Sequence, residues 1–204
     1  MITEFKTLKA PATAEFKDKG SRFLAFAYPL AQAEALKDYV LPLQKEHHKA
    51  VHFCYAYRIG TDGTQFRAND DGEPAGSAGR PILGQIDSAG LSNVLVIVVR
   101  YFGGTLLGVP GLIHAYKTAT ALALANAEII EETVEQSLAV LCAYADMSEV
   151  LRVVKQHQGR VVQQQLALDC RLDLSIPLAH YSACLKQLET LRQITVWVLE
   201  QAPL

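Results

Sequence analysis

The stretch 98-VVRYFGGTLLGVPGLIHAYK-117 joins the end of an apolar, β-branched segment to a group of glycines and then to a helical pattern. Residues 93–102 (NVLVIVVRYF) predict a buried central strand, and residues 112–127 predict a helix. Between them lie four glycines, which we call the glycine corner: Gly103, Gly104, Gly108 and Gly111. A strand that ends in glycines and leads into a helix forms either a tight turn or a loop whose backbone N–H groups bind an anion.

The glycine corner does not match a known phosphate-binding motif. It contains neither GxxxxGK[ST] nor GxGxxG. Pro110 suits the start of a helix, because its missing N–H donor is not needed there. Arg100 and Lys117 could add positive charge beside a bound anion or phosphate. On these residues alone, the structural turn and the anion-binding loop both stay open.

A second candidate feature is the stretch 69-NDDGEPAGSAGRP-81, which we call the acidic loop. Its glycines and prolines predict irregular structure, and such loops carry function or follow the surface. Its candidate binding residues are Asp70, Asp71, Glu73, Ser77 and Arg80. The three carboxylates lack the spacing of an EF-hand, so no metal site is assigned. The alternative is a solvated turn in which Asp and Asn side chains bond to the local backbone.

Arg100 links the two loops in our interpretation. It lies at the end of a predicted buried strand, where an unpaired charge is costly, so it needs a carboxylate or a bound anion. The acidic loop supplies the nearest carboxylates. We therefore expect the two loops to lie side by side, with Gly103 and Gly104 bringing backbone donors close to a ligand that a side chain there would block.

The chain of 204 residues, half of them hydrophobic, is long enough for two small domains. Residues 1–129 hold most of the glycines and all of the loops above. They predict a hairpin over residues 13–30 that turns at Asp18–Gly20, a helix over Gln32–Glu46 and a strand over residues 51–59.

Residues 130–204 repeat a simpler order. We expect strands over Thr133–Ala143, Arg160–Leu168, Cys170–Pro177 and residues 194–200, and helices over Asp146–His157 and Leu178–Leu191. Asp146 is expected to cap the first helix, and Gly159 follows its end. The order β-α-β-β-α-β is the ferredoxin-like arrangement, so the fold class is α+β.

Composition excludes some function classes. The N-terminus has no secretory pattern and no apolar run reaches the roughly 20 residues of a membrane span, so we expect a cytoplasmic protein. The net charge of −2 argues against binding nucleic acid by bulk electrostatics. His52 and Cys54 lie two apart on one strand, where side chains project in parallel, which disfavours a catalytic pair. Arg22 and neighbouring cations form either a basic binding face or a solvated strand face.

Four stretches of this sequence carry a resemblance to a known family: KGSRFLA at 19–25, HFCYAY at 52–57, NDDGEPAGSAGRPIL at 69–83 and VVRYFGGTLLGVPGLIHAY at 98–116. With these motifs in this order, the chain resembles the IMPACT family, and more closely its bacterial two-domain members. The motifs cover nearly all of the first unit. The second unit resembles the companion C-terminal domain of those members, by its position and its β-α-β-β-α-β order.

The resemblance implies a ribosomal-protein-type first domain, akin to domain IV of elongation factor G, and a second domain akin to domain V. It also implies a role related to that of the eukaryotic members, which regulate translation under amino-acid starvation by competing for a scaffold protein that activates an initiation-factor kinase. They act by binding. Bacteria lack that kinase pathway, so the partner does not carry over.

We therefore predict a non-enzymatic, translation- or stress-linked regulator that binds RNA, the ribosome or a ribosome-associated protein, with no cofactor and no membrane contact. The alternative is an enzyme that acts on a phosphorylated small molecule in a pocket formed by the two loops, with Arg100 as anion clamp. A concave pocket enclosed by Arg100, Asp71 and Gly104 would favour the enzyme, and a flat basic face would favour RNA. The predicted binding residues are Arg22, His52, Asp70, Asp71, Glu73, Ser77, Arg80, Arg100, Tyr101, Gly103, Gly104, Gly108 and Lys117.

Overall fold

The computed structural model describes residues 2–167 and 169–199. The contacts between these residues define two compact units. The first consists of residues 5–132, and the second of residues 2–4, 133–167 and 169–199. The division predicted between residues 129 and 130 falls in the same short segment. That the two units fold independently stays a prediction. Both units combine helices with antiparallel sheets, which confirms the α+β fold class.

A five-stranded antiparallel sheet forms the centre of the first unit, in the order β2-β3-β6-β4-β5. Its strands are β2 (Ala12–Asp18), β3 (Ser21–Pro29), β4 (His52–Ile59), β5 (Gln65–Asn69) and β6 (Val94–Tyr101). The predicted central strand is confirmed, because every residue of β6 from Val94 to Val99 is fully buried. The predicted hairpin is β2 and β3, and its turn residues Lys19 and Gly20 both have positive φ, as tight hairpin turns require.

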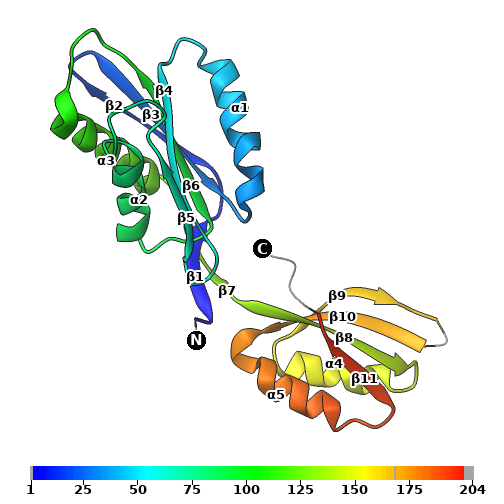
Figure 1. Cartoon of the computed structure of the whole chain (residues 1–204). Coiled ribbons are helices and arrows are strands. Elements are labelled where there is room, and N and C mark those ends of the chain that lie inside the picture. Colours follow the sequence, from blue (N-terminus) through cyan, green and yellow to red (C-terminus); the bar gives the residue numbers. More distant parts are fainter. Residues whose placement is uncertain (1, 168, 200–204) are drawn as a thin grey trace. The chain divides into compact units, whose positions relative to one another are not determined.

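Helices cover both faces of this sheet (Figure 1). α1 (Leu36–Glu46), which follows the short 3-10 helix η1 (Ala33–Ala35), packs on the face that carries Leu95, Ile97 and Val99. α2 (Gly79–Ser88) and α3 (Gly108–Ala125) pack on the opposite face, against the alternate residues of β6. Side chains along a strand alternate between faces, so Arg100 lies on the α2 and α3 face and Tyr101 on the α1 face.

The prediction of irregular structure from residue 69 to residue 81 was wrong at its end, because α2 begins at Gly79. The N-cap position of α2 is Ala78, which has no capping side chain, and the Asp70 carboxylate accepts from the first N–H groups of the helix instead. Gly79 also packs against the backbone of Asn69, where a β-carbon would lie 2.5 Å from its nitrogen. Both contacts are tertiary, so the local pattern of residues does not show them.

Two further strands lie at the ends of the first unit and were not predicted. β1 (Glu4–Leu8) pairs with β7 (Ile129–Thr133) in a separate two-stranded sheet. The predicted strand over Thr133–Ala143 is therefore divided, and β8 (Glu135–Ala143) begins after a break at Val134. The segment that we expected to join the two units is thus itself hydrogen-bonded strand.

The second unit has the predicted β-α-β-β-α-β order. Its elements are β8, α4 (Met147–Gln156), β9 (Arg160–Gln165), β10 (Asp169–Pro177), α5 (Leu178–Glu189) and β11 (Ile194–Val198). The strand order β11-β8-β10-β9, with all pairs antiparallel, is the ferredoxin-like arrangement. Apolar residues of α4 and α5 pack together on one face of this sheet. The predicted strand ends at Leu168 and Glu200 lie outside the described residues.

The ends of α4 correct one prediction and refine another. Asp146 occupies the N-cap position, but its side chain makes no capping hydrogen bond, because its backbone is already helical. At the other end, Gly159 follows the helix as predicted, but the positive φ of 58° belongs to Gln158, the residue before it. Gly159 donates its N–H to the Val154 carbonyl at 2.8 Å. A side chain at Gly159 would meet Ile176.

Candidate binding pocket

Arg100 lies near the end of β6, the central strand of the sheet, between residues of the two neighbouring strands. On β6 it is directly opposite Phe23 of β3 and His52 of β4, so all three side chains lie on the α2 and α3 face. The Arg100 guanidinium lies 5.5 Å from the centre of the Phe23 ring and 5.6 Å from that of the Phe102 ring. Only 6% of the Arg100 side chain is exposed.

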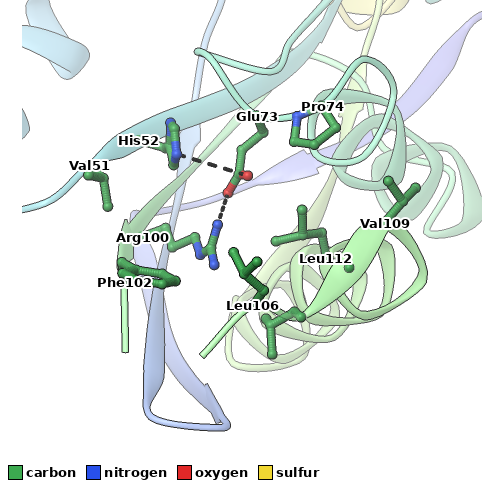
Figure 2. Close-up of a pocket in the computed structure, with 11 residues that line it drawn as sticks. Val51, His52, Glu73, Pro74, Arg100, Phe102, Leu106, Val109 and Leu112 are labelled. Carbon is green, nitrogen blue, oxygen red and sulfur yellow. Dashed lines mark hydrogen bonds and ion pairs between the residues drawn. The ribbon is translucent and has the colours of Figure 1, made fainter. Parts of the chain in front are cut away.

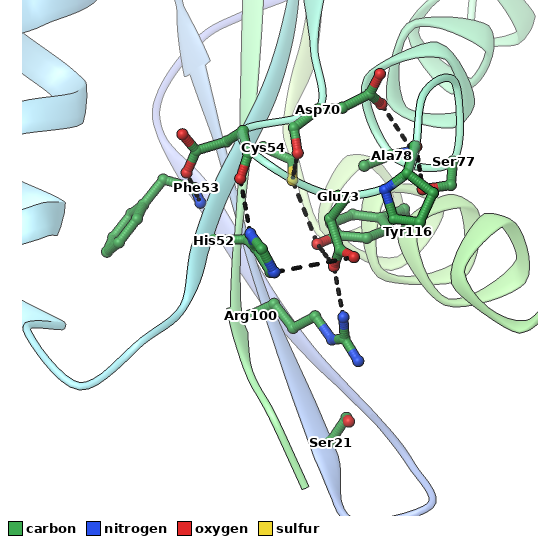
Figure 3. A network of polar contacts seen from close by, with 12 residues as sticks. Ser21, His52, Phe53, Cys54, Asp70, Glu73, Ser77, Ala78, Arg100 and Tyr116 are labelled. Carbon is green, nitrogen blue, oxygen red and sulfur yellow. Dashed lines mark hydrogen bonds and ion pairs between the residues drawn. The ribbon is translucent and has the colours of Figure 1, made fainter. Parts of the chain in front are cut away.

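A buried ion pair joins β6, just before the glycine corner, to the acidic loop. Nη1 of Arg100 donates to Oε1 of Glu73 at 2.6 Å, and the Tyr116 hydroxyl of α3 donates to the same oxygen at 2.7 Å. The Glu73 side chain is only 3% exposed. The expectation that Arg100 pairs with a carboxylate of the acidic loop is confirmed, and the partner is Glu73 (Figure 3).

The polar network continues away from Glu73 into the core. The Cys54 thiol donates to the Tyr116 hydroxyl at 3.3 Å and lies 3.0 Å from the Asp70 carbonyl. Burial raises the pKa of Cys54. Burial also raises the pKa of Tyr116, and the nearby Cys54 and Glu73 raise it further. Both groups therefore stay protonated at neutral pH. A protonated, buried thiol is a poor nucleophile, so Cys54 does not support covalent catalysis.

His52 is oriented by the acidic loop. Its Nδ1 lies 2.7 Å from the Asp71 carbonyl, and because a carbonyl only accepts, Nδ1 carries the proton. Nε2 then lies 3.9 Å from Oε2 of Glu73. The Asp71 carboxylate is turned away from the pocket, since its Oδ2 accepts from the Phe53 N–H at 2.6 Å. Ser77 also has an internal role, because its hydroxyl donates to the Pro74 carbonyl.

Asp70 acts as an internal anion at the start of α2. Its carboxylate accepts from the backbone N–H groups of Gly76, Ala78 and Gly79 at 2.8 to 3.0 Å. Burial raises the pKa of Asp70, but these three donors and the nearby Arg80 outweigh it, so the pKa lies below its usual range. The carboxylate therefore organises the acidic loop rather than facing a ligand.

We expect Asp70→Asn to lower the free energy of unfolding by about 1 to 3 kcal/mol at neutral pH, since it weakens three partly buried hydrogen bonds to a charged acceptor. A carboxylate with a depressed pKa stabilises the fold above its unfolded-state pKa of about 3.9 and loses this effect as the pH falls through the lower folded-state value. The difference in free energy of unfolding between the wild type and Asp70→Asn, measured by urea unfolding, should therefore vanish as the pH falls. The matched control is Asp87→Asn, which removes only a partly exposed ion pair with Arg58. An unchanged gap in acid would contradict this role.

The glycines of the corner have different functions. A β-carbon on Gly103 would lie 1.9 Å from the backbone carbon of Gly20, and the Gly103 N–H already donates to the Ser21 hydroxyl at 3.1 Å. Gly103 thus packs against the β2–β3 turn. Gly104 and Gly108 have positive φ of 85° and 69°. Space around Gly104 is open, and Gly108 is the first residue of α3.

The start of β4, the acidic loop, the end of β6 and the start of α3 line an open pocket of about 390 Å³ (Figure 2). Its polar side chains are those of His52, Glu73 and Arg100. The Arg100 guanidinium extends from the sheet toward the leucines of the opposite wall. Among the rim residues, Leu106 is 83% exposed, and Val51, Phe102 and Val109 are also exposed. The apolar lining residues are Val51, Pro74, Phe102, Leu106, Leu107, Val109 and Leu112.

The other predicted site residues lie elsewhere. Tyr101 and Arg22 are opposite each other on the α1 face of the sheet, where Tyr101 contacts His47 and Arg22 pairs with Glu15. Arg80 and Lys117 are exposed on α2 and α3 and do not line the pocket. Gly103 and Gly104 border the β2–β3 turn and open space, and only Gly108 of the corner lines the pocket.

Sequence reasoning missed the apolar part of the site. Tyr116 was inside a predicted helix, and no role was assigned to the leucines at 106 and 107. The available signal was a pair of leucines between glycines, in a segment too short and too rich in glycine to be a strand. Within residues 2–167 and 169–199, no three His, Cys, Asp or Glu side chains are grouped to hold a metal ion. In the same residues, none of the helices has the length and hydropathy needed to cross a membrane.

Together, the fold and the pocket define an α+β protein of two units, whose first unit holds an apolar pocket built around a buried ion pair. The family model for the Impact N-terminal domain matches residues 19–124, which include the whole pocket. The chain belongs to the IMPACT family.

Relatives of known sequence extend this comparison. The chain is 33% identical to IMPACT family member YigZ of Escherichia coli, over 83% of this chain and 84% of the relative. It is 36% identical to an IMPACT family member of Thermus thermophilus, over 87% and 97%. The Protein IMPACT homolog of Saccharomyces cerevisiae is 38% identical over 53% of this chain and 43% of its own length. A solved structure described as a hypothetical protein matches 98% of this chain with a TM-score of 0.75 and 28% identity.

Proposed function

We propose that the protein is a non-enzymatic, translation-linked regulator that acts in the cytoplasm by binding a protein of the ribosome or a ribosome-associated protein. Membership of the IMPACT family supports the link to translation. The yeast homolog matches about half of this chain, whereas the bacterial relatives match most of it. The family model matches only the first unit, so we assign the shared binding function to that unit.

The exposed apolar rim of the pocket is the observation that carries this proposal. Leu106 is almost fully solvent-exposed beside a concave surface, and Phe102 and Val109 adjoin it. Apolar and aromatic anchors that fit complementary pockets dominate the energy of protein–protein interfaces. A soluble domain that exposes such groups around one pocket presents a recognition surface for another protein.

The charge distribution disfavours RNA as the direct partner of this surface. RNA binding needs unpaired cations along a backbone track and exposed aromatic rings for stacking. Here Arg22 pairs with Glu15 and Arg58 pairs with Asp87. The pocket itself has one cation, Arg100, which is neutralised by Glu73. The whole chain has a net charge of −2.

One observation keeps the enzyme alternative as a second candidate. The pocket volume falls within the range of roughly 300 to 1,000 Å³ that is typical of small-molecule sites, and Arg100 lines it. However, the Asp71 carboxylate is turned to the Phe53 N–H and is absent from the lining. The remaining carboxylate, Glu73, is held by two strong donors. Turnover of a phosphorylated compound that depends on Glu73 would favour this alternative.

Co-sedimentation with purified ribosomes tests the proposal. We expect the wild-type protein to sediment with ribosomes, and Leu106→Asp to reduce the bound fraction at least tenfold by placing a charge at the apolar rim. The matched control is Leu122→Asp, which changes another exposed leucine of the same unit that does not line the pocket. Equal loss in both variants, or binding that Leu106→Asp leaves intact, would contradict the proposal.

A further inference from the structure

We infer that the pocket binds the free C-terminal carboxylate of its partner polypeptide together with an apolar last side chain. This inference rests on the proposed function and deepens it. Its first support is that only part of the hydrogen-bonding capacity of the Arg100 guanidinium is used. Among the described residues its hydrogen-bond partner is Glu73, through Nη1, and Nε is buried without a partner. A side chain that is only 6% exposed and lines the pocket therefore keeps donors that have no acceptor.

The start of α3 supplies a second, independent set of donors. The first N–H groups of a helix have no partner within the helix. Here Pro110 has no N–H, so the donors are those of Leu107, Gly108 and Val109, and all three residues line the pocket. No side chain caps this helix and its first turn has no acidic residue. α2 differs, because Asp70 already occupies the corresponding place at its start.

The charges in the pocket favour a carboxylate over a phosphate. The positive charge of Arg100 is already matched by Glu73, so the helix start and the remaining guanidinium donors provide only partial positive charge. A ligand with a single, delocalised negative charge can accept from both sets of donors. A phosphate dianion carries two negative charges, so the Glu73 carboxylate would repel it more strongly than it would repel a carboxylate. The ligand head group is therefore a carboxylate.

The shape and lining of the pocket favour a chain end over an acidic side chain. At a C-terminus, the carboxylate and the last side chain are attached to the same Cα, so both enter a pocket together and the chain leaves on one side only. An Asp or Glu side chain would bring two flanking peptide segments and no apolar group. The walls formed by Leu107, Val109 and Leu112 match an apolar last residue such as leucine.

Fluorescence anisotropy with matched peptides tests this inference on the full-length wild-type protein. The probes are two labelled pools of four-residue peptides with mixed upstream residues and a fixed terminal leucine, one with a free carboxylate and one with a C-terminal amide. We expect the acid pool to bind at least tenfold more tightly than the amide pool. Sodium acetate should compete with the acid pool at least as well as potassium phosphate at equal ionic strength. Arg100→Gln should remove the preference for the acid, whereas Lys117→Gln should keep it, with circular dichroism confirming that both variants are folded.

Other outcomes overturn the inference. Equal binding of acid and amide, or no binding of either pool at 1 mM peptide (about 4 kcal/mol of binding energy), would exclude a carboxylate site. Stronger competition by phosphate than by acetate would reassign the pocket to phosphate. The proposed function is tested separately by adding the acid pool in excess to the ribosome assay. Ribosome binding that Leu106→Asp abolishes but the peptide does not displace would leave the proposed function standing and reject the C-terminal carboxylate.

Discussion

Arg100→Ala is expected to lower the free energy of unfolding of the first unit by about 3 to 5 kcal/mol, because it leaves the buried Glu73 carboxylate without its partner. Far-UV circular dichroism follows both units during urea unfolding. Fluorescence of Trp197, the one tryptophan of the sequence, follows the second unit. Because we predict that the two units fold independently, the loss should appear in the circular dichroism transition and not in the fluorescence transition.

Two controls separate a buried ion pair from a general effect of removing arginine. Arg22→Ala removes a pair in which the arginine side chain is 50% exposed, so it should change stability by no more than about 1 kcal/mol. The double variant Arg100→Met with Glu73→Leu removes both buried charges and should recover much of the loss. If Arg100→Ala destabilised no more than Arg22→Ala, the ion pair would not be a structural centre of the pocket.

Gly103→Ala is expected to have the second large effect. The added β-carbon would lie 1.9 Å from the Gly20 carbon and 2.1 Å from the Ser21 nitrogen, and both are backbone atoms that no rotamer change can move. Overpacking commonly costs about 1 to 3 kcal/mol, and a backbone clash this close should reach or exceed the upper value. The variant should separate the β2–β3 turn from the corner and lower the melting temperature clearly.

The chain offers two matched glycines for comparison. Gly84→Ala places a methyl group in open space on α2, so it should be neutral or slightly stabilising, by up to about 1 kcal/mol. Gly104→Ala also meets no atom, but its φ of 85° makes the substitution strained. We expect the order of stability to be Gly84→Ala, then Gly104→Ala, then Gly103→Ala. A Gly103→Ala variant as stable as Gly104→Ala would contradict the packing of the corner on the hairpin.

Sequence reasoning located the main elements of both units because their signals are local. The β-branched run of β6, the hairpin turn at Gly20 and the helix–strand alternation of the second unit each depend on neighbouring residues. α2 was missed because its capping group, Asp70, and its packing against Asn69 come from outside the helix. β1 and β7 were missed for the same reason, since each is a strand only through its pairing with the other.

The candidate site was predicted in part. The need of a buried arginine for a carboxylate is a rule of energetics, so the pairing of Arg100 with the acidic loop followed from the sequence. Which carboxylate pairs depends on how the loop turns, and this turn directs Asp70 to the helix start and Glu73 to Arg100. Tyr101 and Arg100 were both predicted for the site. Because they are adjacent along β6, their side chains lie on opposite faces of the sheet.

Site-specific photo-crosslinking from position 106 tests the central claim most directly. p-Benzoylphenylalanine would replace Leu106 at the pocket rim in one variant and Leu122, away from the pocket, in the other. Each variant would be irradiated with purified ribosomes and with a ribosome wash that contains associated proteins. We predict a crosslink from position 106 to one protein, lost when the acid peptide is present in excess, and no such crosslink from position 122. A crosslink from position 106 to ribosomal RNA, or equal labelling from both positions, would contradict the claim that this pocket binds a protein partner.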